Sequence, residues 1–107
     1  MTIRVYNKLV RDRIPGIIGD TGDVPTFRLL DDEEYLAALN AKLLEEVAEY
    51  NEAKSIEELA DVFQVIRTIA EQIGGGLSEL QYISREKSLE RGGFEMRVFL
   101  ESVEEKK

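Results

Sequence analysis

Acidic residues recur at a spacing of three in two neighbouring segments of the chain. Glu46 and Glu49 lie in the first segment, and Glu58 and Asp61 lie in the second. In an α-helix, residues at this spacing share one face and lie about 4.5 Å apart along the axis. Carboxylate oxygens without nitrogen or sulfur ligands favour Mg²⁺, or Mn²⁺ in its place. The spacing therefore predicts one carboxylate metal site, provided that the two segments are adjacent helices.

Two of the four acids interrupt apolar helical faces. On an ideal helical wheel, Glu46 falls beside Leu39 and Tyr50, and Glu58 falls beside Val65. Converging carboxylates repel one another and raise their own pKa values, and a divalent cation would relieve that repulsion. A solvated acidic face is the competing interpretation, since acid-rich helix surfaces usually have no ligand.

The two acid pairs are symmetric about a turn between Ala53 and Lys54. In an antiparallel hairpin, Glu46 should then face Asp61, and Glu49 should face Glu58. Packed helix axes lie about 8–10 Å apart, so the four side chains can converge on one small volume.

Three capping signatures predict the helices that must position these acids. Each is a Ser or Asp followed three residues later by Glu or Gln: Asp31 with Glu34, Ser55 with Glu58, and Ser78 with Gln81. We therefore expect helices over about 32–53, 56–73 and 78–91. Glycines at 74–76 and 92–93 should end the last two.

The remaining segments carry weaker patterns. Residues 4–18 predict two short helical turns with a break near Arg13, because Pro15 suits the first turn of a helix. The patterns of residues 24–30 and 96–103 predict two strands that could pair with each other. The prediction is a single, mostly α domain over residues 1–107, with a helical hairpin, a third helix and a minor two-stranded β element.

Composition limits both partners and chemistry. The net charge of −8 opposes binding to polymeric nucleic acid and to anionic membranes, and no stretch of 18 apolar residues is present. We expect a cytoplasmic protein with no membrane partner. Cys and His are absent, which excludes disulfides, Cys/His zinc sites and Ser-His-Asp triads.

The acid motif also resembles a known signature. Leu44-Glu45-Glu46-Val47-Ala48-Glu49 followed by Glu58-Leu59-Ala60-Asp61 is similar to the Glu-Glu-x-x-Glu … Glu-x-x-Asp motif of MazG-like all-α nucleoside triphosphate pyrophosphohydrolases. The stretches 6–15 (Tyr-Asn-Lys-Leu-Val-Arg-Asp-Arg-Ile-Pro) and 90–94 (Glu-Arg-Gly-Gly-Phe) resemble a small single-domain branch of that superfamily. One departure is the spacer of eight residues between Glu49 and Glu58, which is shorter than in typical MazG proteins.

This resemblance implies a fold, a cofactor and a reaction. Mg²⁺ would be held by Glu46, Glu49, Glu58 and Asp61, and Glu45 would orient a ligand or a water molecule. The implied reaction is water attack at the α-phosphorus of a nucleoside triphosphate, which yields monophosphate and pyrophosphate. MazG-like proteins are typically homodimers or homotetramers in which such hairpins build a four-helix bundle, and the wide apolar arc of residues 56–73 agrees with that assembly.

A triphosphate substrate also requires cations. Lys8 with Arg11, and Lys87 with Arg91, would each present two positive charges on one helical side, and Lys42 precedes Glu46 by one turn. Ordinary surface pairing with nearby acids is the competing interpretation of these residues.

Two other functions stay open. Phosphoribosyl-ATP pyrophosphohydrolase, within the same superfamily, uses the same metal chemistry on a modified nucleotide. A non-enzymatic helical module could instead use the wide apolar arc to bind a protein partner, with acids that only solubilise it.

Overall fold

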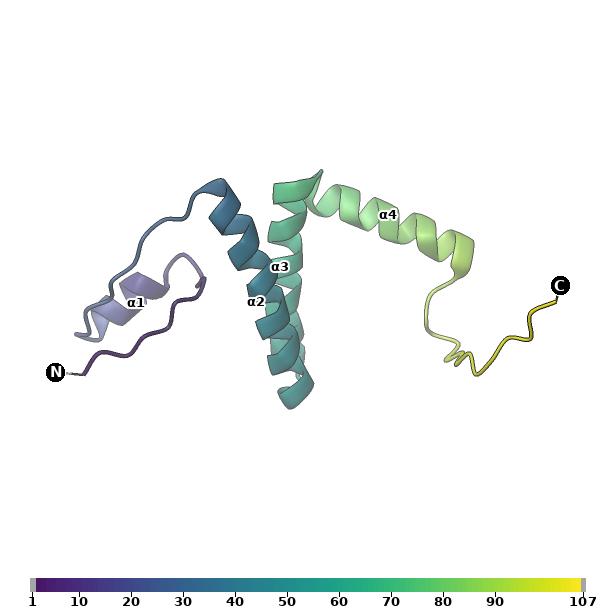
Figure 1. Ribbon diagram of the computed structural model, residues 1–107, viewed down its shortest axis with the longest axis horizontal. Coiled ribbons are helices and arrows are strands. Elements are labelled where there is room, and N and C mark those ends of the chain that lie inside the picture. The colour runs from purple at the N-terminus through teal and green to yellow at the C-terminus, as the bar shows by residue number, and fades with distance from the viewer. Residues whose placement is uncertain (1, 107) are drawn as a thin grey trace.

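The computed structural model describes residues 2–106, and all of its regular structure is helical. Helix α1 spans Ile14–Asp20, α2 spans Asp32–Ala53, α3 spans Ile56–Ile73 and α4 spans Gly76–Arg91. The mostly α class is therefore confirmed. In Figure 1, α2 and α3 form a central hairpin, with α1 on one side and α4 on the other.

Helix α2 begins at the predicted capping box. The Asp31 carboxylate accepts a hydrogen bond from the Glu34 backbone N–H at 2.8 Å, and the Glu34 carboxylate accepts one from the Asp31 N–H at 3.4 Å. These two bonds satisfy donors that a helix N-terminus otherwise leaves free. The helix ends at Lys54, whose backbone is left-handed with φ 50° and ψ 38°.

Helix α3 packs against α2 as the second half of the hairpin. Its N-cap is Ser55, whose hydroxyl accepts a hydrogen bond from the Glu58 backbone N–H at 3.2 Å. The buried apolar residues of the described chain are Leu39 on α2 and Val65 on α3. Few residues of the hairpin are therefore fully covered, and Glu46 is one of them.

Helix α4 begins two residues earlier than its predicted start. No side chain caps it, and Ser78 lies within its first turn. The turn from α3 requires glycine at Gly76, which is buried and has φ +73°, a conformation that side chains with a Cβ rarely adopt. Helix α4 packs against α3 and otherwise projects into solvent (Figure 1).

The prediction of a helical turn before Arg13 is wrong. Residues 2–11 form an irregular arm, in which Asn7 has φ 46°, and α1 begins only at Ile14. Pro15 does lie in the first turn of that helix, as expected. A single turn lacks the length and the packed apolar face that would stabilise it, so the arm follows its contacts with α2 instead.

The predicted two-stranded β element is also wrong for this chain. Within residues 2–106 there is no strand, and segments 24–30 and 96–103 are irregular. Figure 1 shows them at opposite ends of the molecule, on the α1 side and beyond α4. A strand needs a partner for its backbone groups, and these two segments do not meet.

The molecule is far more open than a globular chain of its size. Its radius of gyration is 19.2 Å, against about 13 Å for a compact domain of this length. Its accessible surface is 10,068 Å², against about 6,000 Å² for a compact protein of its mass. No helix in the described part is long and apolar enough to cross a membrane.

Candidate functional site

Three of the four predicted acids meet at the hairpin. Glu46 on α2 and Glu58 and Asp61 on α3 each offer a carboxylate oxygen, and these oxygens lie within 4.8 Å of one another. The i, i+3 spacing on α3 and the antiparallel packing of α2 produce this convergence. Such a separation suits one small cation with oxygen ligands.

Two oxygens of this cluster are buried without a protein donor. Glu46 is 6% exposed, and neither its Oε2 nor the Oε2 of Glu58 accepts a hydrogen bond from any residue between 2 and 106. A buried acceptor without a partner costs about 1–3 kcal/mol, and more when it carries a charge. A cation bound between the two side chains would remove that cost.

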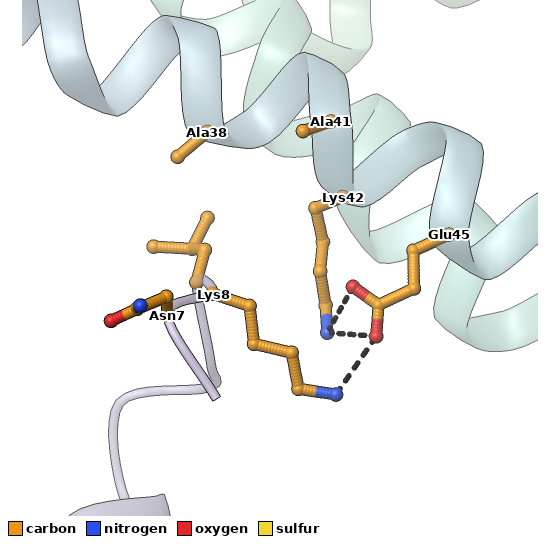
Figure 2. Close-up of a pocket in the computed structure, with 7 residues that line it drawn as sticks. Asn7, Lys8, Ala38, Ala41, Lys42 and Glu45 are labelled. Atoms are coloured by element: carbon orange, nitrogen blue, oxygen red, sulfur yellow. Dashed lines mark hydrogen bonds and ion pairs between the residues drawn. The ribbon is translucent and has the colours of Figure 1, made fainter. Parts of the chain in front are cut away.

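Lys42 and Lys8 bring positive charge to the α2 side of the cluster. Lys42 Nζ lies 3.2 Å from Glu46 Oε1. It also lies 3.5 Å from both carboxylate oxygens of Glu45, as Figure 2 shows. Lys8 Nζ donates to Glu45 Oε1 at 2.9 Å. The hydrogen bond from Lys8 holds the pKa of Glu45 below its usual range, and that same bond raises the pKa of Lys8. Glu45 thus links the N-terminal arm to α2.

Arg11 also reaches the cluster, through Asp61. Its guanidinium donates to Asp61 Oδ1 at 2.7 Å, across fifty residues of sequence. Both side chains are about half exposed, so this pair adds little stability by itself. The pair matters for the site because it places the Arg11 guanidinium beside Asp61, a candidate metal ligand.

The charges of the site do not balance. Five carboxylates (Glu45, Glu46, Glu49, Glu58 and Asp61) face three cations (Lys8, Arg11 and Lys42). The surplus of two negative charges equals the charge of one divalent cation.

Glu49 lies at the edge of this site. It is exposed and does not belong to the group of three acids, yet its pKa is raised, first by the negative charge of Glu46. The charges of Glu45 and Glu58 act in the same direction. Glu49 is therefore close enough to repel the cluster, although the oxygens of the other three lie closer together.

Replacing Glu49 with Gln should stabilise the metal-free protein near pH 7. The folded-state pKa of Glu49 is raised, so the carboxylate destabilises the fold increasingly as pH rises from the unfolded-state pKa through the folded one. We expect the melting midpoint of Glu49→Gln in EDTA to exceed that of the wild type by a few degrees. At about pH 3, more than one unit below the ordinary glutamate pKa of about 4.3, Glu49 is largely protonated in both states and the difference should vanish.

Glu52→Gln provides a matched control for this measurement, because Glu52 is exposed on the same helix one turn later. Its midpoint should stay at the wild-type value. A lower midpoint for Glu49→Gln than for the wild type near pH 7 would show that Glu49 is not repelled by the cluster.

Lys87 and Arg91 do not join the acids within one chain. They lie on α4 and line a shallow depression of about 810 Å³, whose other residues are Ser84, Ser88, Gly92, Gly93, Phe94 and Glu95. In Figure 1 this end of α4 is well separated from the acid-bearing half of the hairpin. Of the five predicted substrate-binding cations, Lys8, Arg11 and Lys42 are thus beside the acids, and the two on α4 are not.

A small depression beside the arm was not predicted. It has a volume of about 120 Å³, and its lining consists of Asn7, Lys8, Leu9, Ala38, Ala41, Lys42 and Glu45 (Figure 2). The role of Glu45 as a bridge between Lys8 and Lys42 was also not predicted. The pairing of Lys42 with Glu45 at i, i+3 was nevertheless visible in the sequence. The pairing of Lys8 with Glu45 had no local signal.

The similarity of this chain to a known protein covers part of its length. No known family model matches the chain, and no solved structure matches it. The chain is similar to an uncharacterized protein of Mycolicibacterium smegmatis, with 59% identity over 46 residues. That match covers 43% of this chain and 47% of the relative, so the chain spans about half the length of the curated protein it matches.

Proposed function

We propose that this chain is a Mg²⁺-dependent nucleoside triphosphate pyrophosphohydrolase, which releases nucleoside monophosphate and pyrophosphate. The observation that supports it most is the pair of buried carboxylate oxygens without partners, one on Glu46 and one on Glu58, beside Asp61. The resemblance of the acid motif to MazG-like pyrophosphohydrolases supplies the reaction class.

The acids divide into ligands and supporting groups. Glu46, Glu58 and Asp61 would hold the metal, and Glu49 would join them by a change of side-chain rotamer. Mn²⁺ would substitute for Mg²⁺, because both prefer oxygen ligands. Mg²⁺, when bound, supplies charge stabilisation on the phosphate oxygens and activation of the attacking water.

The cations of the arm have a defined part in this proposal. Lys8 and Arg11 are held by Glu45 and Asp61, two acids beside or within the metal cluster. A triphosphate carries several negative charges close together, and guanidinium groups bind phosphate oxygens with paired donors. Arg11 would therefore exchange Asp61 for a phosphate oxygen as the substrate and the metal bind. Lys42 would stay with Glu46 and orient its carboxylate.

The proposal includes assembly as a homodimer or homotetramer. Helix α3 leaves large apolar side chains exposed, among them Ile56, Leu59, Phe63 and Ile73. Packing of two hairpins into a four-helix bundle would cover them, since the chain exposes about 4,000 Å² more than a compact protein of its mass. Light scattering that reports a monomer at micromolar concentration would contradict this assembly.

The decisive experiment is a nucleotide panel with Mg²⁺ in which the products are separated by ion-exchange chromatography. Standard and modified nucleoside triphosphates should be included, together with phosphoribosyl-ATP. Monophosphate and pyrophosphate are the expected products. Diphosphate and orthophosphate would refute cleavage between the α and β phosphates.

A helical interaction module is the second candidate, and the many exposed apolar side chains favour it. Absence of turnover with every nucleotide of the panel would support this candidate. Calorimetry on the same sample separates the two, because an interaction module has no reason to bind Mg²⁺ through Glu46 and Glu58.

A further inference from the structure

The two segments that read as strands in the sequence are both exposed. In segment 24–30, Val24 is 90% exposed and Leu29 is 89% exposed. In segment 96–103, Val98 is 82% exposed and Phe99 is 85% exposed. Contiguous apolar surface of this kind is rare on soluble monomers and marks a site of association. Both segments have the β-branched and aromatic composition that favours strand pairing.

The two segments cannot pair with each other within one chain while α4 keeps its place. Helix α4 has 16 residues and so spans about 24 Å away from the hairpin. Only four residues, 92–95, connect it to segment 96–103, and they reach at most about 14 Å. Segment 24–30 leads into the start of α2 on the other side of the hairpin (Figure 1). A partner strand must therefore come from another molecule.

We infer that segment 96–103 of one copy pairs, as a β-strand, with segment 24–30 of a second copy. The exchange is reciprocal, so each copy gives one segment and receives one. This forms a closed two-fold dimer rather than an open chain. The inference concerns an interaction surface and does not depend on the metal site.

A second copy is the partner because it supplies both missing strands at once. Its segment 24–30 can pair with segment 96–103 of the first copy, and its own segment 96–103 can pair with segment 24–30 of the first copy.

One contact links the receiving segment to the hairpin. The guanidinium of Arg28 donates to both carboxylate oxygens of Glu34, at 3.1 and 2.8 Å, in the first turn of α2. Pro25 lacks a backbone N–H, so one edge of this segment is unsuited to a ladder and the opposite edge is favoured.

The surface area of the chain agrees with such a dimer. Each copy exposes about 4,000 Å² more than a compact protein of equal mass. Two copies together therefore exceed the roughly 2,000–5,000 Å² that obligate dimers bury in total, which leaves area for the exchange as well as for packing of the hairpins.

The exchange has one consequence for the candidate site, and this consequence rests on the proposed function. Lys87 and Arg91 lie in the last two turns before the exchanged segment. Pairing would carry them to the end of the second copy where Lys8 and Arg11 face its acids. The second copy's phosphate-binding cations would then come from both chains.

Cysteine pairs test the exchange directly, because the chain has no cysteine of its own. Thr26→Cys and Val98→Cys are made in separate chains, one of them with a larger tag, and the chains are mixed, re-equilibrated and oxidised with glutathione. Leu100→Cys, two residues further along, samples a shifted register on the same face. The expected result is a mixed disulfide dimer in yield roughly tenfold or more above that of Asn40→Cys with Val98→Cys, since docking raises the local concentration.

Asn40 is exposed on α2 and measures random collision. The inference is overturned if Thr26→Cys gives no more mixed disulfide than this control, both with Val98→Cys and with Leu100→Cys. A double variant, Thr26→Cys with Val98→Cys, that closes within one chain and stays monomeric on dilution overturns it as well.

Val98→Pro gives a second measurement, since proline removes a ladder hydrogen bond. In the Leu100→Cys chain, Val98→Pro should lower the yield of the mixed disulfide with Thr26→Cys to that of the Asn40→Cys control, and Glu105→Pro, beyond the segment, should leave the yield unchanged. Equal yields with the two proline variants count against the exchange. Neither experiment uses nucleotide or Mg²⁺, so failure of the proposed function would leave the cross-link intact, and failure of the exchange would leave turnover by the metal site open.

Discussion

Replacing Glu46 with Gln should lower the rate of triphosphate hydrolysis by about a thousandfold or more. The substitution keeps the size of the side chain and removes the charge of the most buried acid in the cluster. Metal ions supply several kcal/mol of transition-state stabilisation, and each 1.36 kcal/mol corresponds to a factor of ten in rate. Pyrophosphate release at saturating Mg²⁺ measures the effect. Glu58→Gln and Asp61→Asn should behave in the same way.

Glu57→Gln is the matched control for these variants. Glu57 is exposed and lies in the first turn of α3, directly beside Glu58 in sequence. Its rate should equal that of the wild type. If Glu46→Gln also retained the wild-type rate, the metal site assigned to the hairpin would be wrong, and another part of the chain would carry any turnover.

The helices of the hairpin were predictable because local signals define them. The capping box at Asp31 and the cap at Ser55 determine where α2 and α3 begin, and both helices have their predicted ranges. The start of α4 was misplaced because Ser78 resembles a cap, whereas Gly76 allows the chain to turn two residues earlier. Sequence spacing also predicted the meeting of Glu46 with Asp61, because an antiparallel hairpin leaves few registers.

The contacts of the arm were not predictable, because they join residues far apart in sequence. Lys8 and Glu45 are separated by 37 residues, and Arg11 and Asp61 by 50. The helical spacing that suggested Lys8 with Arg11 was wrong in structure, yet both residues still reach acids of the cluster. Their long side chains adapt to an irregular backbone, so the charge pattern was a better guide than the periodicity.

The strand patterns show a different limit of sequence reasoning. Alternation in segment 96–103 describes which residues would share a face, but it does not say where the partner strand lies. The hydrophobic pattern therefore indicated that these segments tend to pair as strands. The prediction that they pair with each other within one chain was wrong. Residues 92–95 are too short to carry segment 96–103 from the end of α4 back to segment 24–30, and the position of that end is known only from the fold.

Mg²⁺ should raise the melting midpoint of the wild type by about 10–20 °C at a hundred times its dissociation constant. A ligand that binds only the folded state adds about 2.7 kcal/mol at that concentration, and 1 kcal/mol corresponds to roughly 4–8 °C for a domain near this size. The folded state offers buried carboxylate oxygens without partners, and the unfolded chain offers only solvated ones. Differential scanning fluorimetry with Mg²⁺, and with Mn²⁺ in its place, measures the shift.

General screening of the net charge of −8 also stabilises a fold, so NaCl at the ionic strength of the Mg²⁺ sample is the necessary control. EDTA should reverse the Mg²⁺ shift and leave the NaCl shift unchanged. In Glu46→Gln only the shift due to screening should remain, because Glu46 is the most buried residue among the proposed ligands. An equal Mg²⁺ shift in Glu46→Gln and in the wild type would mean that the cation binds elsewhere on the acidic surface, and that Lys42 alone compensates the charge of Glu46.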